Sequence, residues 1–216
     1  MKRLIIETVR KVASSLPGWM MPKKFKYVTE FWFWKTRTML EGPVLANDFY
    51  KDKFLDAAGF ENDDWTEGKV IADFGCGPRG SLCWATRSAR RIGIDVLTDK
   101  YRELGIEKHD MEYVKSTEKD IPLESGIADV VTTFNAIDHV IDFPAMVNEM
   151  MRILKPGGLF IASINLDEAP TFCEPQTLTE EMVNEHLLLH LEVGRKVIED
   201  NLPKGRKMYL RGTKLV

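Results

Sequence analysis

The sequence has few cysteines, no long run of apolar residues and no overall excess of basic charge. Its 216 residues include only three cysteines, and these lack the spacing of a metal site. We therefore expect reduced thiols, no metal centre and a cytoplasmic protein. No apolar segment approaches the length of a transmembrane helix, and charged residues interrupt the N-terminal segment where a signal peptide would have its apolar core.

Charge is unevenly distributed along the chain, although its net value is only −3. Basic residues outnumber acidic ones seven to one in residues 1–26 and five to none in residues 203–216, so the middle of the chain is acidic. An acidic body argues against a nucleic acid as the main partner. The basic ends instead suggest peripheral contact with an anionic membrane or with an acidic partner protein.

The first 60 residues are expected to form helices that cover the rest of the molecule. In residues 2–16 apolar side chains recur at helical spacing, and Pro17-Gly18 ends the pattern. This amphipathic helix suits either a lid packed on the domain or a helix docked at a membrane surface, and we favour the lid. Residues 27–59 form a second helical region that is rich in aromatic side chains. Most of these should fill the core, and one or two could cover a cationic ligand.

From Lys69 onward, apolar strands alternate with helical segments. Strands are predicted at 70–74, 91–95, 112–115, 128–134 and 158–164, and helices at 80–88, 99–104, 144–153 and 177–189. Two further strand-like segments, near 191–198 and 207–214, flank a Lys204-Gly205 turn and predict a hairpin at an antiparallel edge. This alternation is typical of an α/β fold with a mostly parallel sheet covered on both faces. We expect a Rossmann-like, doubly wound sheet of seven strands in residues 61–216, with residues 1–60 as an N-terminal helical lid.

The most informative motif is a glycine-rich loop directly after the first predicted strand. Residues 70–80 read VIADFGCGPRG, so a buried strand passes into a tight turn whose glycines let the backbone approach a nucleotide-like ligand. Three glycines also fit the dinucleotide pattern G-x-G-x-x-G: Gly75, Gly77 and Gly80. However, Asp73 would repel a diphosphate, and Pro78 removes one N–H donor that a phosphate would need. Both features favour a cationic ligand.

This loop resembles motif I of the class I S-adenosylmethionine-dependent methyltransferases, whose pattern is close to D-x-G-C-G-x-G. Residues 128–140 resemble the fourth strand of that family and the loop after it. Residues 149–158, EMMRILKPGG, resemble its E-x-x-R-x-L-K-P-G-G segment. The matching segments span residues 69–165 in the family's order and spacing. The chain is therefore similar to the type 11-like methyltransferases, and the resemblance implies S-adenosyl-L-methionine as the cofactor and methylation as the activity.

The resemblance also indicates which residues bind the cofactor. It assigns Asp95, at the end of the second predicted strand, to the ribose hydroxyls. It assigns the adenine to the loop after the third strand, where Thr117 departs from the family's usual aspartate and either Thr117 or Glu118 could accept from the adenine amino group. Asn135 follows the fourth strand, at the edge where open α/β sheets bind ligands. The predicted cofactor-binding residues are Asp73, Gly75, Cys76, Gly77, Asp95, Val96, Thr117, Glu118 and Asn135.

Two neighbouring residues after the fourth predicted strand are the catalytic candidates. Methyl transfer mainly requires alignment of the nucleophile, but a hydroxyl nucleophile also benefits from a base. His139 is the best candidate for that base, and Asp138 could orient it or accept the proton itself. The acceptor pocket should come from the N-terminal helices and residues 165–176, in which Glu174 and Gln176 could bind substrate hydroxyls.

These expectations describe transfer of a methyl group to a small molecule, with the hydroxyl oxygen of a sugar, lipid or other metabolite favoured as the acceptor atom. Two alternatives stay open. An NAD(P)-dependent oxidoreductase would share the glycine pattern and Asp95. A methyltransferase-like binding protein without turnover is suggested only by Thr117. The sequence leaves the acceptor and the oligomeric state undetermined.

Overall fold

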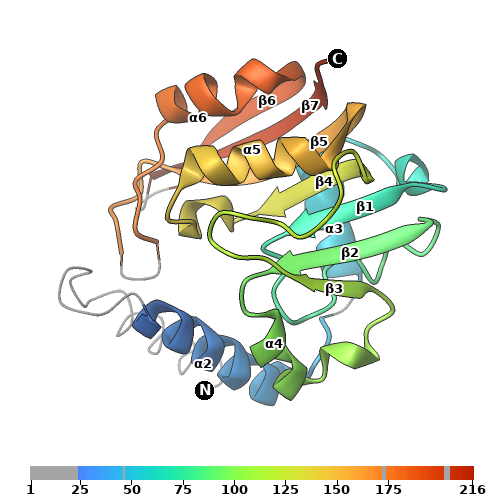
Figure 1. Ribbon diagram of the computed structural model, residues 1–216, viewed down its shortest axis with the longest axis vertical. Coiled ribbons are helices and arrows are strands. Elements are labelled where there is room, and N and C mark those ends of the chain that lie inside the picture. Colours follow the sequence, from blue (N-terminus) through green and yellow to red (C-terminus); the bar gives the residue numbers. More distant parts are fainter. Residues whose placement is uncertain (1–23, 46, 172–173, 202–204) are drawn as a thin grey trace.

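A seven-stranded sheet runs through the computed structural model, which describes residues 24–45, 47–171, 174–201 and 205–216. The strand order is β3-β2-β1-β4-β5-β7-β6 (Figure 1). The strands are β1 (Val70–Phe74), β2 (Arg90–Asp95), β3 (Glu112–Lys115), β4 (Ala128–Phe134), β5 (Leu154–Leu166), β6 (Leu191–Asn201) and β7 (Gly205–Lys214). The first five strands pair in parallel, and the β6–β7 hairpin adds an antiparallel edge beside β5. The predicted Rossmann-like fold is confirmed.

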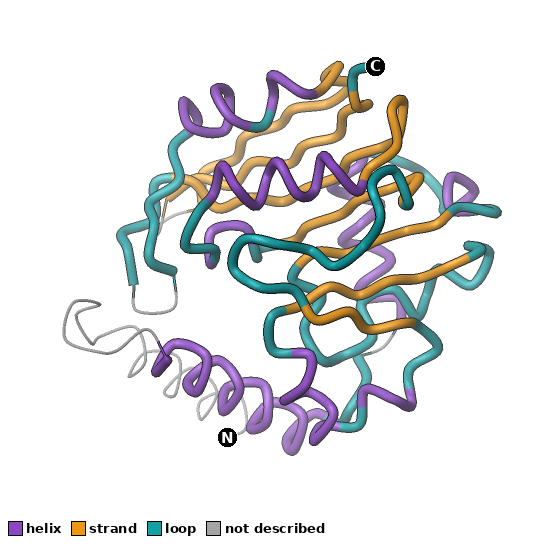
Figure 2. The backbone as a smooth tube through the Cα atoms, in the orientation of Figure 1, coloured by secondary structure: helices purple, strands orange, loops and turns teal. Residues whose placement is uncertain are grey.

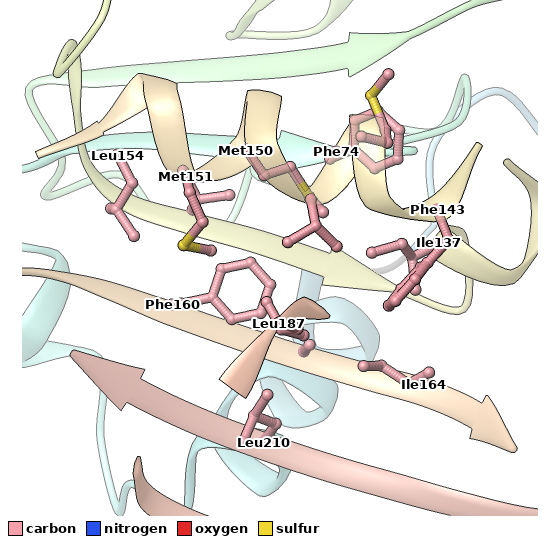
Figure 3. Close-up of a cluster of buried hydrophobic side chains, with 14 of the residues drawn as sticks. Phe74, Ile137, Phe143, Met150, Met151, Leu154, Phe160, Ile164, Leu187 and Leu210 are labelled. Carbon is pink, nitrogen blue, oxygen red and sulfur yellow. The ribbon is translucent and has the colours of Figure 1, made fainter. Parts of the chain in front are cut away.

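The helices cover both faces of this sheet (Figure 2). They are α2 (Lys24–Glu41), α3 (Asn47–Ala58), α4 (Thr98–Tyr101), α5 (Phe143–Ile153) and α6 (Glu180–His186). On one face, Met150 of α5 and Leu187, which directly follows α6, are buried in a large cluster with Phe160 and Leu210 of the sheet (Figure 3). On the other face, Phe54 of α3 packs in a second cluster with Ile71. Because both faces are covered, the central strands are buried along nearly their whole length.

The start of α5 shows how the local sequence determines where a helix begins. Asp142 caps the helix, because its Oδ1 accepts a hydrogen bond from the Ala145 N–H at 3.0 Å. Pro144 follows in the first turn. A backbone N–H at this position would have no acceptor within the helix, so proline, which lacks the N–H, costs no hydrogen bond there. Behind this cap, apolar side chains recur at helical spacing and enter the core.

One predicted helix is absent, because residues 80–88 form a series of turns. Gly80 has a positive φ of 68°, and the N–H groups of Cys83 and Ala85 donate to the carbonyls three residues earlier. The apolar residues of this segment still enter the core, where Leu82 and Trp84 join the cluster made by α3. The apolar pattern of this segment therefore marks buried turns, and the predicted helix is wrong. In the structure, α3 is the helix that covers this region.

Other predictions differ in their bounds. The helix predicted at 177–189 is α6 followed by a 3-10 turn at Leu188–His190, and the one predicted at 99–104 is α4 followed by a 3-10 turn at Arg102–Leu104.

The predicted helix at 2–16 lies outside the described residues. The division of the chain at residue 60 stays a prediction, although α3 shares its apolar cluster with the sheet. Among the described helices, none has the length and apolar character needed to cross a bilayer.

Candidate active site

A cavity of about 660 Å³ lies at the carboxyl ends of β1, β2, β4 and β5, beneath α2 and α3. This volume falls within the range of small-molecule sites. In Figure 1, α2 lies beyond the carboxyl ends of the central strands, while the other helices flank the sheet. All the predicted cofactor-binding residues line this cavity: Asp73, Gly75, Cys76, Gly77, Asp95, Val96, Thr117, Glu118 and Asn135.

The glycine-rich loop passes very close to neighbouring elements. Gly75 and Gly77 both have positive φ angles, 72° and 60°. A Cβ on Gly75 would lie 2.1 Å from the Cβ of Ala136, and one on Gly77 would lie 3.1 Å from the ring of Trp34 on α2. Backbone conformation favours glycine at both positions, and at Gly75 the lack of space excludes any larger residue. The loop presents its backbone to the cavity between the end of β4 and α2.

Asp73 joins the glycine-rich loop to β4. Its Oδ2 accepts from the Ser81 hydroxyl at 2.6 Å, and its Oδ1 accepts from the Thr132 hydroxyl at 2.7 Å. Burial raises the pKa of Asp73 to about 6, and the two hydrogen bonds act in the opposite direction. Both carboxylate oxygens therefore have partners within the protein, while the residue also contributes to the cavity wall.

Asp95 fixes the shape of the loop from the end of β2. Its Oδ2 accepts from the Gly77 N–H at 3.1 Å, and its Oδ1 accepts from the Leu97 N–H at 2.9 Å. Burial and, to a lesser extent, the negative charge of Glu30 on α2 raise the pKa of Asp95 to about 7. Each oxygen retains a lone pair for a second donor, such as a ligand hydroxyl.

The N-terminal half of α2 covers the loop after β3. The Tyr27 hydroxyl donates to Glu118, and Lys26 donates to the main-chain carbonyl of His139. Burial, together with the neighbouring Glu118, raises the pKa of the Tyr27 phenol. The sequence indicated that aromatic residues of this region could cover a ligand. It gave no sign of the polar contacts, which depend on where α2 lies in the tertiary structure.

A chain of side-chain amides connects the ends of β4 and β5. Asn135 adopts a positive φ of 53°, a conformation that asparagine tolerates better than most residues. Its Oδ1 accepts from the Asn165 amide at 2.6 Å, and the same amide donates to Asp138 Oδ2 at 3.0 Å. Asp138 is only 5% exposed, and this burial raises the pKa of its carboxyl group. Asn165, which the sequence analysis did not single out, holds Asp138 in place.

His139 lies beside two carboxylates. Its Nε2 is 3.5 Å from Glu174 Oε1, and potential metal-binding atoms of Asp138, His139 and Glu174 all lie within 4.8 Å of one another. Such a group could stabilise a protonated imidazole or hold a divalent cation. Gln176 donates instead to the carbonyls of Val140 and Ile141, so its contacts support the loop and its predicted role in binding acceptor hydroxyls finds no support.

The sequence is similar to that of known methyltransferases. Residues 72–162 match the family described as the methyltransferase domain. A dimethylglycine N-methyltransferase from Parasynechococcus marenigrum is 30% identical over 130 residues, covering 56% of this chain and 45% of that protein. A ubiquinone biosynthesis O-methyltransferase from Pectobacterium atrosepticum is 32% identical over 109 residues, covering 45% of this chain and 44% of that protein. The chain thus spans less than half the length of these curated relatives.

A solved S-adenosylmethionine dependent methyltransferase from Mesorhizobium loti shares the fold, with a TM-score of 0.56 at 14% identity over 71% of this chain and 99% of that one. Residues 72–162 match the methyltransferase family model, and the curated and solved S-adenosylmethionine-dependent methyltransferases support the predicted class I resemblance. The predicted family is confirmed, and with it S-adenosyl-L-methionine as the implied cofactor. The nicotinamide alternative, which rested on the glycine pattern and Asp95, receives no support from these comparisons.

The residues of this methyltransferase fit that cofactor chemically. The cofactor carries hydroxyls, an amino group and a sulfonium cation, and the cavity offers three carboxylates near the glycine-rich loop and α2: Glu30, Asp95 and Glu118. In addition, Asn165 Oδ1 is buried and has no hydrogen-bond partner among the described residues. A buried acceptor without a partner costs stability and is a position at which a ligand donor can bind.

Proposed function

We propose that this methyltransferase transfers a methyl group from S-adenosyl-L-methionine to a hydroxyl oxygen of a small molecule. The observation that carries the proposal is that one cavity contains both the motif residues and His139 with its acidic neighbour Glu174. A methyl donor held by Asp95 would therefore share one cavity with a proton acceptor. No separate movement of domains is needed to bring the two together.

Each residue has a distinct part in this mechanism. The cofactor, when bound, supplies a methyl group on a positively charged sulfur. Asp95 and the backbone of the glycine-rich loop would hold it, and alignment of an acceptor oxygen with its methyl group would contribute several kcal/mol. His139 accepts the hydroxyl proton, and Glu174 stabilises the resulting imidazolium ion. Asn165 orients the buried carboxylate of Asp138 beside them.

Oxygen is favoured as the acceptor atom because a hydroxyl loses a proton during transfer. A base next to the acceptor contributes roughly 10²–10⁴ to the rate of such a reaction. The similarity to a ubiquinone biosynthesis O-methyltransferase supports this choice, whereas the similarity to a dimethylglycine N-methyltransferase supports nitrogen. A sugar, lipid or other hydroxylated metabolite fits the proposal.

Calorimetry tests the cofactor assignment. S-adenosylmethionine and S-adenosylhomocysteine would be titrated into the wild-type protein and Asp95→Ala, with NADH and NADPH as controls. We expect both methyl-cofactor forms to bind the wild-type protein, and the variant to bind at least about tenfold more weakly, a loss of about 1.4 kcal/mol. Binding of a nicotinamide cofactor alone would reject the proposal. Tight cofactor binding with no transfer to any of a broad panel of acceptors would support a binding protein without turnover.

We also propose that the basic N-terminal segment contacts an anionic membrane or an acidic partner. The C-terminal basic residues support this less, because Arg206 pairs with Asp167, and Lys214 donates to the carbonyls of Met151 and Leu154. Co-sedimentation with anionic and neutral liposomes would compare the full chain with one lacking residues 1–18. Equal recovery of both proteins with both lipids would reject the membrane contact.

A further inference from the structure

Part of the cavity wall is basic, although Glu168 and Glu174 also line the same cavity. Three cationic side chains from three different elements line it: Arg37 of α2, Lys53 of α3 and Lys207 of β7. We propose that Lys53 and Lys207 bind an anionic group, a carboxylate or a phosphate, carried by the methyl acceptor. This inference rests on the proposed function and specifies the class of its substrate.

The sheet register places Lys207 beside the catalytic candidates. Lys207 on β7 is the direct antiparallel partner of Asn165 on β5, and directly opposed residues project from the same face of a sheet. Asn165 in turn donates to both Asn135 and Asp138. An anion on Lys207 would therefore lie a short distance from the proton-accepting group, and the acceptor hydroxyl could lie between the two.

Within the part of the chain that the structure describes, neither lysine has a carboxylate partner at ion-pair distance. Arg37 forms an ion pair with Glu41 at 2.9 Å, but no described carboxylate forms an ion pair with Lys53 or Lys207. The Lys53 ammonium lies 4.8 Å from the centre of the Phe49 ring, which also lines the cavity. Desolvation lowers the pKa of Lys53, and the charges of Lys207 and Arg37 lower it further. A bound anion would relieve this mutual repulsion.

The charge distribution would also determine how the acceptor is oriented in the cavity. Glu30 acts on Asp95, and Tyr27 of the same helix donates to Glu118, so these three carboxylates gather beside α2 in the same cavity. Opposite charges in the two parts of the cavity would draw an anion toward the lysines and repel it from these carboxylates. An acceptor bound in this way would keep its anionic group away from the cofactor ribose and present its hydroxyl near His139.

The cofactor's own carboxylate is a second anion that could meet these lysines, so the experiment must separate the two sources. Protein saturated with S-adenosylhomocysteine would be titrated with inorganic phosphate and with 4-hydroxybenzoate, whose methyl ester serves as a neutral control. The same titrations would use the variants Lys53→Met, Lys207→Met and Lys207→Arg. Lys100→Met is the matched control, because it removes an exposed lysine of α4 that does not line the cavity.

We expect at least one of the two anions to bind the loaded wild-type protein, and the ester to bind more weakly. Each lysine-to-methionine change should weaken anion binding about tenfold, with Lys207→Arg and Lys100→Met near wild type. Affinity for S-adenosylhomocysteine should change less than about threefold in all of them. Thermal unfolding of each variant would establish that it folds.

Two results would overturn the inference. One is that neither anion binds the loaded wild-type protein. The other is that the methionine variants lose affinity for S-adenosylhomocysteine but not for 5′-methylthioadenosine, which lacks the amino-acid portion, because the lysines would then hold the cofactor's carboxylate. If the wild-type protein bound no S-adenosylhomocysteine at all, the proposed function itself would have failed, so the two failures are distinguishable.

Discussion

Asp73 and Asp95, two buried carboxylates beside the glycine-rich loop, make the stability of the protein depend on pH. Burial raises the pKa of Asp73 to about 6 and that of Asp95 to about 7. An unfolded chain releases these protons near pH 4. Between pH 4 and pH 7 the folded state therefore binds more protons than the unfolded state, and stability falls as the pH rises through this window. Above pH 7 the full penalty of the charged forms is present.

Asp95→Asn should therefore stabilise the cofactor-free protein at pH 8. The gain should be about 1 to 2 kcal/mol, because one pKa unit corresponds to about 1.4 kcal/mol. The amide has one acceptor oxygen where the carboxylate has two, so one of the N–H groups of Gly77 and Leu97 loses its acceptor, which offsets part of the gain. Urea denaturation of wild type and variant at pH 8 and pH 5 would measure the difference, which should be smaller at pH 5. A variant that is less stable than wild type at pH 8 would contradict this account of Asp95.

His139 should matter for the chemical step and not for cofactor binding. With an acceptor found by screening, His139→Gln should lower kcat about 10²–10³-fold. Its affinity for S-adenosylhomocysteine should stay within about threefold of wild type. His190→Gln, in a 3-10 turn that does not line the cavity, is the matched control. A variant with near wild-type kcat would show that alignment alone suffices and that no base is needed.

Chelation separates the two roles open to Asp138, His139 and Glu174. If His139 acts as the proton acceptor, dialysis against EDTA should leave kcat unchanged within about twofold, because the imidazole lone pair must be free to take a proton. Activity would be compared before dialysis, after it, and after addition of Mg²⁺ or Zn²⁺. Activity that is lost on chelation and restored by a divalent cation would assign the three residues to a metal site instead.

At the scale of elements, α2 is the segment that closes the site. Its Trp34 packs against the glycine-rich loop, its Tyr27 donates to Glu118, and its Lys26 contacts the main chain of His139. The helix thus contacts the loops that follow β1, β3 and β4. The stability of α2 and the shape of the cavity should therefore depend on each other.

Removing the Trp34 ring should open the cavity above the loop. We expect Trp34→Ala to weaken S-adenosylhomocysteine binding about tenfold, because an aromatic side chain contributes a large buried area and can attract a cation. Trp32→Ala on the same helix is the matched control, since Trp32 is 54% exposed and does not line the cavity. Calorimetric titration of both variants provides the measurement. Equal losses in the two would indicate that α2 as a whole had been destabilised.

The elements show which sequence signals were reliable. The strands β1 and β4 were predicted with their observed bounds, because short apolar runs between turn residues specify buried strands well. The segment 80–88 was misread as a helix, because buried turns and buried helices place apolar residues at similar spacings. Only the tertiary structure shows that α3, from a distant part of the sequence, covers this face.

At the scale of the whole molecule, the fold brings together residues that are far apart in sequence. The motif residues could be predicted from sequence, because strand ends in a doubly wound sheet meet at one edge. The pairing of His139 with Glu174 and the position of Lys207 opposite Asn165 could not, because both depend on loop and strand placement across the chain. The result is a cavity whose wall combines the motif residues, His139 with Glu174, and the basic side chains of Arg37, Lys53 and Lys207.

The most direct test of this account is a crystal structure of the protein with S-adenosylhomocysteine. The account predicts that the ribose hydroxyls lie within about 3 Å of the Asp95 carboxylate, the distance of a hydrogen bond. It also predicts that the sulfur faces the part of the cavity lined by His139 and Glu174. A ligand bound outside this cavity, or one whose sulfur points away from His139, would contradict the central claim that the cofactor and the acceptor share this site.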